Sequence, residues 1–125
     1  MKDIAERLRT KEQEMATEKG PFLLFALFLR EDAPDLWDLV VSAPWIEADK
    51  GQALAYIASK VGEALSLDEI TKLSRIALID RSNPALEAVQ QAIHIEHGLA
   101  DLQDSVFFGI PIRHAYIVTS RREAA

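Results

Sequence analysis

The run Phe22-Leu23-Leu24-Phe25-Ala26-Leu27-Phe28-Leu29 decides the fold. Its residues are all apolar, so both faces of an extended segment here are apolar, as in a strand that is covered on both sides. The run is much shorter than the roughly 20 residues that span a bilayer. Arg30-Glu31-Asp32 follows it, where a secretory signal has a cleavage site of small residues. We therefore predict a buried strand over 22–29 and expect no membrane association.

The composition is that of one globular domain spanning 1–125, with 49% hydrophobic and 27% charged residues. The chain has no cysteine, which excludes disulfides, thiolate metal sites and a cysteine nucleophile. A chain without cysteine also fits a reducing compartment, and we expect a cytoplasmic protein. The net charge of −6 argues against nucleic-acid binding, because contacts to phosphates need a basic face.

A helix is predicted before the apolar run, because residues 2–18 are rich in helix-favouring side chains. Lys19-Gly20-Pro21 is a good stop signal for this helix. Its apolar stripe is thin, with only Ile4, Leu8 and Met15 at near-helical spacing. A helix with so few apolar residues gains little from burial. We therefore expect the segment 1–19 to lie on the surface or to pack against a second subunit.

The residues after the run predict a hairpin followed by helices. The polar stretch 30–36 is a turn, and Trp37–Ala43 is a second strand that forms the hairpin with the first. A long helix over roughly 48–65 follows, with apolar residues at helical spacing. Ser66 and Glu69 have the spacing of a capping box, which predicts a short helix before the third strand at 75–79.

The last third of the chain predicts one more helix and a second hairpin. Asn83 and Pro84 are typical of a helix start, and the helix runs to Ile93. The segments 106–108 and 112–119 form the hairpin across a turn that contains glycine and proline. Two alternatives stay open for 94–104, a loop or a further edge strand. Residues 120–125 are expected to form a flexible tail.

The predicted order of elements is α-β-β-α-α-β-α-β-β. The helical crossover between the second and third strands makes these two strands parallel, whereas both hairpins are antiparallel. We therefore predict an α+β fold with a mixed sheet of about five strands that helices cover.

Two loops follow the predicted parallel strands, at Ser42–Trp45 and Asp80–Pro84. Parallel strands bring such loops to one edge of the sheet, where ligands bind near helix N-termini that favour anions. The candidate ligand-binding residues are the polar and aromatic side chains of these loops: Ser42, Trp45, Asp80, Arg81, Ser82 and Asn83. In the alternative interpretation these residues only cap a helix, face solvent or, for Trp45, belong to the core.

The histidines are the candidate metal ligands. His94, Glu96 and His97 follow the last predicted helix, and His114 lies on the final strand. Such residues can supply a hydrolytic zinc site, which needs three ligands and one open position. Their spacing matches no recognised signature such as His-Glu-x-x-His. Histidines near a helix C-terminus are also favourable simply through the helix dipole.

Acidic residues surround the hairpin turn. Asp38 interrupts the second strand, close to Glu31, Asp32 and Asp35. The group is not an EF-hand, because the central glycine and terminal glutamate are missing at their spacing. We interpret these residues as a polar turn plus one solvent-facing position of the hairpin. Trp37 alternates with Asp38, so one of the two side chains should face outward.

The chain has no glycine-rich phosphate loop and no nucleophile elbow, and it identifies no cofactor. The sequence does not settle whether the chain is an enzyme. It favours a non-catalytic interaction or regulatory module. We expect such a module to form a homo-oligomer or to bind a protein partner. One alternative hypothesis is a metal-dependent hydrolase that uses the histidine group. Another is a binder of a small anionic ligand at the two loops.

Overall fold

The computed structural model describes residues 1–32, 35–107 and 109–123. Its helices and strands follow the predicted order with one short helix added after the second strand. In chain order the elements are α1 (Lys2–Lys19), β1 (Leu24–Arg30), β2 (Trp37–Ser42), α2 (Pro44–Ala48), α3 (Lys50–Ala64), α4 (Leu67–Ile70), β3 (Leu73–Leu78), α5 (Pro84–Ala92), β4 (Ala100–Phe107) and β5 (Ile110–Ser120).

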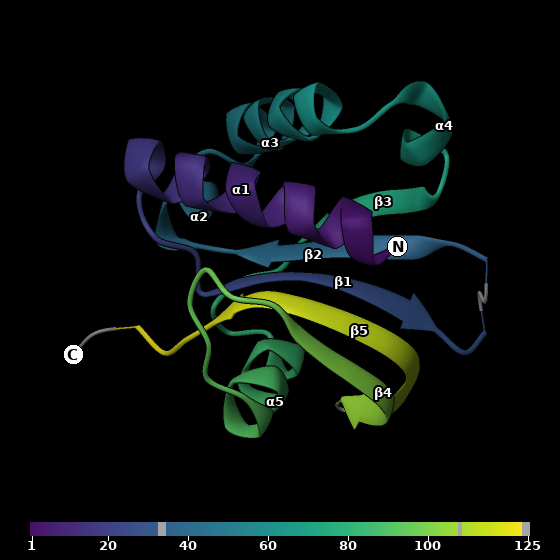
Figure 1. Ribbon diagram of the computed structural model, residues 1–125. Coiled ribbons are helices and arrows are strands. Elements are labelled where there is room, and N and C mark those ends of the chain that lie inside the picture. Colours follow the sequence, from purple (N-terminus) through teal and green to yellow (C-terminus); the bar gives the residue numbers. More distant parts are fainter. Residues whose placement is uncertain (33–34, 108, 124–125) are drawn as a thin grey trace.

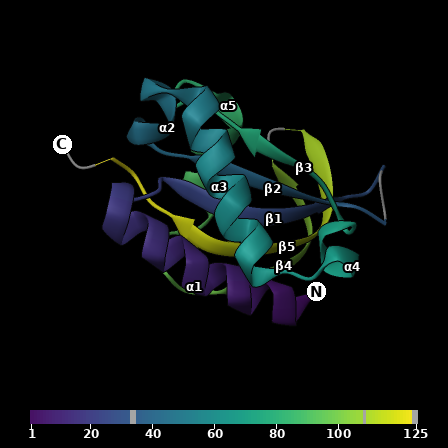
Figure 2. The ribbon, with the colours of Figure 1, turned by 90° about the horizontal axis from the view of Figure 1, so that it is seen from above.

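The five strands form one mixed sheet in the order β3-β2-β1-β5-β4 (Figure 1). β2 and β3 are parallel, and the other neighbouring strands are antiparallel. The predicted α+β fold with a mixed sheet is therefore confirmed. α1 and α3 cover one face of the sheet and α5 lies on the other, which gives three layers (Figures 1 and 2).

β1 occupies the centre of the sheet, as its apolar sequence predicts. Phe25 and Leu27 are buried in the core under α1 and α3. Leu24, Ala26 and Phe28 are buried on the opposite side, in a second core that includes side chains of α5. Because the strand alternates between two covered faces, it needs apolar residues at every position.

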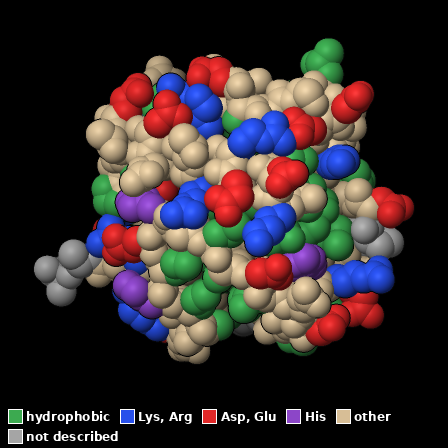
Figure 3. Space-filling view, in the orientation of Figure 1, with side chains coloured by type: hydrophobic (Ala, Val, Ile, Leu, Met, Phe, Trp, Pro, Cys, Tyr) green, Lys and Arg blue, Asp and Glu red, His purple; other side chains and the backbone are tan. Residues whose placement is uncertain are grey.

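α1 lies across the sheet beside α3 (Figure 2). Its stripe of Ile4, Leu8 and Met15 is buried within this chain, and Glu12 is buried with it. The sequence predicted a surface or subunit-interface helix because this stripe is sparse. In the structure the stripe belongs to the domain's own core, while the opposite side of α1 is exposed and carries intermixed acidic and basic side chains (Figure 3).

Helix caps form where the sequence predicts them. The side chains of Ser66 and Glu69 make the reciprocal bonds of a capping box at the start of α4. Glu69 also pairs with Arg7 of α1, whose Nη1 donates to Glu69 Oε1 at 2.7 Å. The Arg7 guanidinium, together with the N–H of Ser66, lowers the pKa of Glu69 to about 2. This pair links the start of α1 to α4.

The C-terminal hairpin is longer than predicted. β4 begins at Ala100, so the second half of the uncertain stretch 94–104 is an edge strand. The predicted flexible tail, residues 120–125, begins too early in the chain, because residue 120 still belongs to a strand. Ser120 ends β5, and its hydroxyl donates to Ile93 O at 2.9 Å. The N–H of Arg121 donates to Leu23 O at 3.0 Å, which extends the pairing with the residues before β1. Residues 124–125 lie outside the described residues.

Among the described residues, no helix combines the length and the apolar character that crossing a bilayer requires.

Candidate functional site

A groove lies on the face of the sheet that carries α5, which we call the α5 face. α5 has only 9 residues, so it covers only part of this face. The β4–β5 hairpin bends toward the same side and forms a second wall (Figure 1). The cavity between them measures about 280 Å³ and is lined mainly by apolar side chains, among them Phe28, Val40, Ala77, Ile79, Phe107 and Ile112. This groove is the candidate functional site.

Strand register brings charged residues to one end of the groove. Val40 of β2 is in register with Ala77 of β3, and Asp38 is in register with Arg75. Residues in register point to the same side of a sheet, so Asp38 and Arg75 share the α5 face with the apolar lining. Arg30 at the end of β1 lines the same cavity. Asp38, Arg30 and Arg75 are named together below as the polar end of the groove.

Asp38 is the buried member of the polar end. Its side chain is 7% exposed, whereas those of Arg30 and Arg75 are 36% and 58% exposed. Nε of Arg75 lies 3.5 Å from Asp38 Oδ1, and Nε of Arg30 lies 3.8 Å from Oδ2. At these distances the contacts are ion pairs rather than hydrogen bonds. Asp38 also lines the cavity, and its carboxylate oxygens are not among the fully enclosed side-chain atoms of the described residues that lack a partner.

The burial of Asp38 corrects the sequence interpretation, which assigned it to a solvent-facing position. The interpretation that Trp37 or Asp38 faces outward is wrong, because both side chains are buried. Trp37 points to the side of α1 and α3 and stacks on Tyr116, with ring centroids 5.6 Å apart. Asp38 points to the groove. Neighbouring side chains shield both residues, Arg30 and Arg75 on the side of Asp38 and Tyr116 on the side of Trp37, so alternation along the strand does not expose either one.

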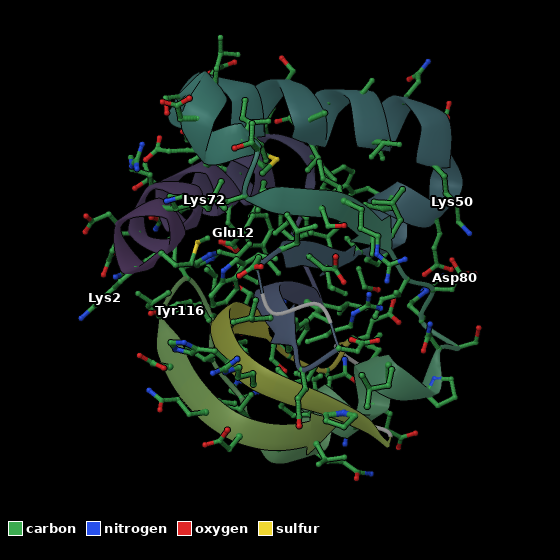
Figure 4. The ribbon with its side chains drawn as sticks, turned by 90° about the vertical axis from the view of Figure 1, so that its right-hand side faces the viewer. Lys2, Glu12, Lys50, Lys72, Asp80 and Tyr116 are labelled. Atoms are coloured by element: carbon green, nitrogen blue, oxygen red, sulfur yellow. The ribbon has the colours of Figure 1, made fainter. Side chains whose placement is uncertain are left out.

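The two loops predicted as an anion site do lie side by side. Nζ of Lys50 is 2.7 Å from Asp80 Oδ1, and the two side chains meet in Figure 4. Nε of Arg81 is 2.9 Å from Glu47 Oε2, and Nη1 of Arg81 is 2.8 Å from Glu123 Oε2. The parallel relation of β2 and β3 therefore brings the second loop next to α2 and α3, and its charged residues pair with side chains of these helices and of the C-terminal segment.

The other residues of these loops have structural contacts or face solvent. Asn83 caps α5, accepting the N–H of Ala85 at 2.9 Å, and it also lines the groove. Trp45 donates from Nε1 to Gly20 O at 2.9 Å and packs on Phe22 and Tyr56. Ser82 is exposed. Ser42 is fully buried, and its hydroxyl has no hydrogen-bond partner among the described residues.

His97 holds α1 against the end of β5. Its Nδ1 contacts the carboxyl group of Glu12, and its backbone N–H donates to Thr119 Oγ1 at 3.1 Å. Thr119 in turn donates to Glu12 Oε2 at 2.7 Å. Nε of Arg9 donates to His97 O at 2.8 Å. This network, formed by Glu12, His97 and Thr119, is called the α1 anchor below.

The other histidines lie elsewhere. Nε2 of His114 is 2.6 Å from Asp101 Oδ1, and its ring centroid is 4.6 Å from that of Tyr116. His94 is exposed in the loop after α5. His114 and Thr119 are five positions apart on β5, which is roughly 16 Å at about 3.3 Å per residue. In the described part of the chain, no three or more His, Asp or Glu side chains are grouped so that they could hold a metal ion. The histidine side chains visible in Figure 3 form no single cluster.

Sequence reasoning missed the polar end of the groove. Two signals were present, an aspartate inside an apolar strand and an arginine in the third strand. Neither signal shows by itself that Arg75 and Asp38 are neighbours, because the pairing depends on the register between β2 and β3.

Comparison with models of protein families, with curated proteins and with solved structures finds no significant match to this chain. The functional argument therefore depends on the geometry of the groove.

Proposed function

We propose that this chain is a non-catalytic binding domain, and that the groove of the α5 face binds a small amphipathic molecule. The apolar part of the ligand lies on Val40, Ala77 and Ile79, and its polar head lies at the polar end. Binding sites of this kind combine a mostly apolar wall with a few well-placed polar groups.

The observation that carries the proposal is Asp38. Its side chain is 7% exposed, yet no described residue gives its carboxylate a hydrogen bond. Asp38 borders the cavity, and its two arginine partners stay at ion-pair distance, so its carboxylate oxygens are open to a hydrogen-bond donor on a ligand. A polar ligand head that donates to Asp38 while its apolar part fills the groove would satisfy both features.

We predict that an amphipathic dye with an aromatic body binds in the groove. Ala77→Phe places a large side chain in the groove, so we expect it to weaken the binding of anilinonaphthalene sulfonate roughly tenfold, equal to about 1.4 kcal/mol. Fluorescence titration of the folded variants measures this change. Ala58→Phe makes the same substitution at an exposed position of α3 and is the matched control. Equal dye binding by the two variants, with the circular dichroism of the wild type, would contradict a binding groove at this site.

A second candidate function, self-association, is supported by β3. This strand is at the edge of the sheet. The N–H of Ile79 donates to Val41 O at 3.0 Å, so the N–H and C=O of the preceding Leu78 point to the outer side. An edge strand with unpaired backbone groups is a template for pairing with another chain. Pairing of two β3 strands would continue the sheet across a homodimer.

Self-association predicts a solution mass above the 14.0 kDa of one chain. Light scattering coupled to size-exclusion chromatography, over a range of protein concentrations, measures this mass. A mass of one chain at every concentration tested would exclude the homodimer while leaving the groove hypothesis intact.

A further inference from the structure

We propose that the ligand of the groove is a free apolar α-amino acid, such as leucine or phenylalanine, bound as its zwitterion. This inference rests on the proposed function of the groove and specifies the chemistry of its ligand. It starts from the polar end, where a buried carboxylate lies between two guanidinium groups, 3.5 Å from one Nε and 3.8 Å from the other.

The two arginines retain donors for a ligand. Their ion pairs with Asp38 use Nε, and Nε of Arg30 also lies 3.4 Å from the exposed Asp32. No described residue accepts a hydrogen bond from the terminal Nη1 and Nη2 groups of either arginine. A guanidinium binds a carboxylate well because its planar donors match the two carboxylate oxygens. A ligand carboxylate at this end would therefore find guanidinium donors on two side chains that border the cavity.

A ligand that carries only a negative or only a positive charge fits the polar end less well than a zwitterion does. A simple carboxylate would lie next to Asp38 and be repelled by it, and a simple amine would lie next to Arg30 and Arg75. An α-amino acid presents an ammonium group and a carboxylate side by side. The ammonium supplies three donors to Asp38, and the carboxylate faces the guanidinium groups. This complementarity of both charges selects the zwitterion.

The apolar part of the groove selects the side chain. Phe28, Val40, Ala77 and Ile79 line a cavity of about 280 Å³. This volume is at the lower end of small-molecule sites, which range from about 300 to 1,000 Å³. It suits one apolar side chain of medium size better than an extended peptide. A peptide also carries its ammonium and carboxylate groups at opposite ends, so it cannot place the ammonium on Asp38 and the carboxylate on Arg30 and Arg75 at the same time.

Isothermal titration calorimetry with a series of leucine derivatives tests the inference. We expect L-leucine to bind, and L-leucinamide, N-acetyl-L-leucine and L-alanine each to bind about tenfold more weakly or worse. These compounds lack the carboxylate, the ammonium and the long side chain, respectively. Binding of leucinamide or acetyl-leucine as tight as that of leucine would overturn the zwitterion. If octanoate binds and the amino acids do not, the groove function stands and the ligand class is overturned.

Two variants separate this inference from the proposed function. Asp38→Asn keeps the size of the side chain and removes its charge, so we expect leucine binding to fall at least about tenfold, whereas binding of the anionic dye should not fall. Asp32→Asn removes an exposed acid next to the same Arg30 and should leave leucine binding unchanged. Undiminished leucine binding by the folded Asp38→Asn variant would overturn the inference. Failure of leucine, octanoate and the dye to bind the wild type would overturn both proposals.

Discussion

Replacement of Phe25 by alanine is expected to lower the free energy of unfolding by about 3–5 kcal/mol. Phe25 is fully buried on the central strand, in register with Val41 of β2 and Thr119 of β5. Its ring makes an edge contact with Phe22, with ring centroids 5.1 Å apart. The substitution leaves a cavity between the sheet and its two helices, and surrounding elements pack too tightly to close it.

Urea unfolding followed by circular dichroism measures this loss. Leu67→Ala is the control, because Leu67 is 84% exposed and its truncation should change stability by less than about 0.5 kcal/mol. Small domains have about 5–15 kcal/mol of stability, so Phe25→Ala removes a large share of it. If that variant does not fold, Phe25→Leu should show a smaller loss in the same direction. Similar losses for Phe25→Ala and Leu67→Ala would contradict a core at this face.

The fold is predictable from the sequence where its signals are local. The apolar run 22–29 identifies a doubly covered strand because alternation alone places its residues on both faces. Ser66 and Asn83 identify helix starts because a cap acts on N–H groups two or three residues away. The parallel relation of β2 and β3 follows from the helices between them. Each of these inferences depends only on residues that are close in the sequence.

The groove is not predictable in the same way, because it depends on elements that are distant in the sequence. Asp38 becomes the buried centre of the polar end through its register with Phe28 on one side and Arg75 on the other. The cavity exists because α5 is short and the hairpin of β4 and β5 bends over the same face. Sequence alternation shows that Trp37 and Asp38 point to opposite sides, but it does not show that both sides are covered.

The burial of α1 shows the same limit. Its stripe looks thin because Glu12 is polar, yet this residue completes the buried face of the helix. Its partners His97 and Thr119 lie 85 and 107 residues away in the chain. Nothing near Glu12 in the sequence indicates that a carboxyl group at this position would be satisfied. The position of α1 therefore depends on the α1 anchor as well as on apolar contacts.

Replacement of Glu12 by alanine is accordingly expected to lower the free energy of unfolding by about 2–4 kcal/mol, because it leaves a buried hydroxyl and an imidazole without their partner. Glu12 is fully buried, and so is Thr119. Glu14→Ala, on the exposed side of the same helix, is the matched control, because the contact of Glu14 with Lys11 is a surface pair and such pairs contribute little to stability. Equal losses for the two variants would exclude a stabilising α1 anchor.

A double-mutant cycle distinguishes the anchor from a general loss of helix packing. Thr119→Val removes the hydroxyl that donates to Glu12 Oε2 at 2.7 Å and keeps the shape of the side chain. If the two residues act through this hydrogen bond, the losses for Glu12→Ala and Thr119→Val overlap, and the coupling energy is about 0.5–3 kcal/mol. Simple additivity of the two losses would mean that the hydrogen bond from Thr119 contributes nothing to the stabilising effect of Glu12. A positive coupling would show that a carboxyl group, rather than a further apolar residue, fixes this helix to the end of β5.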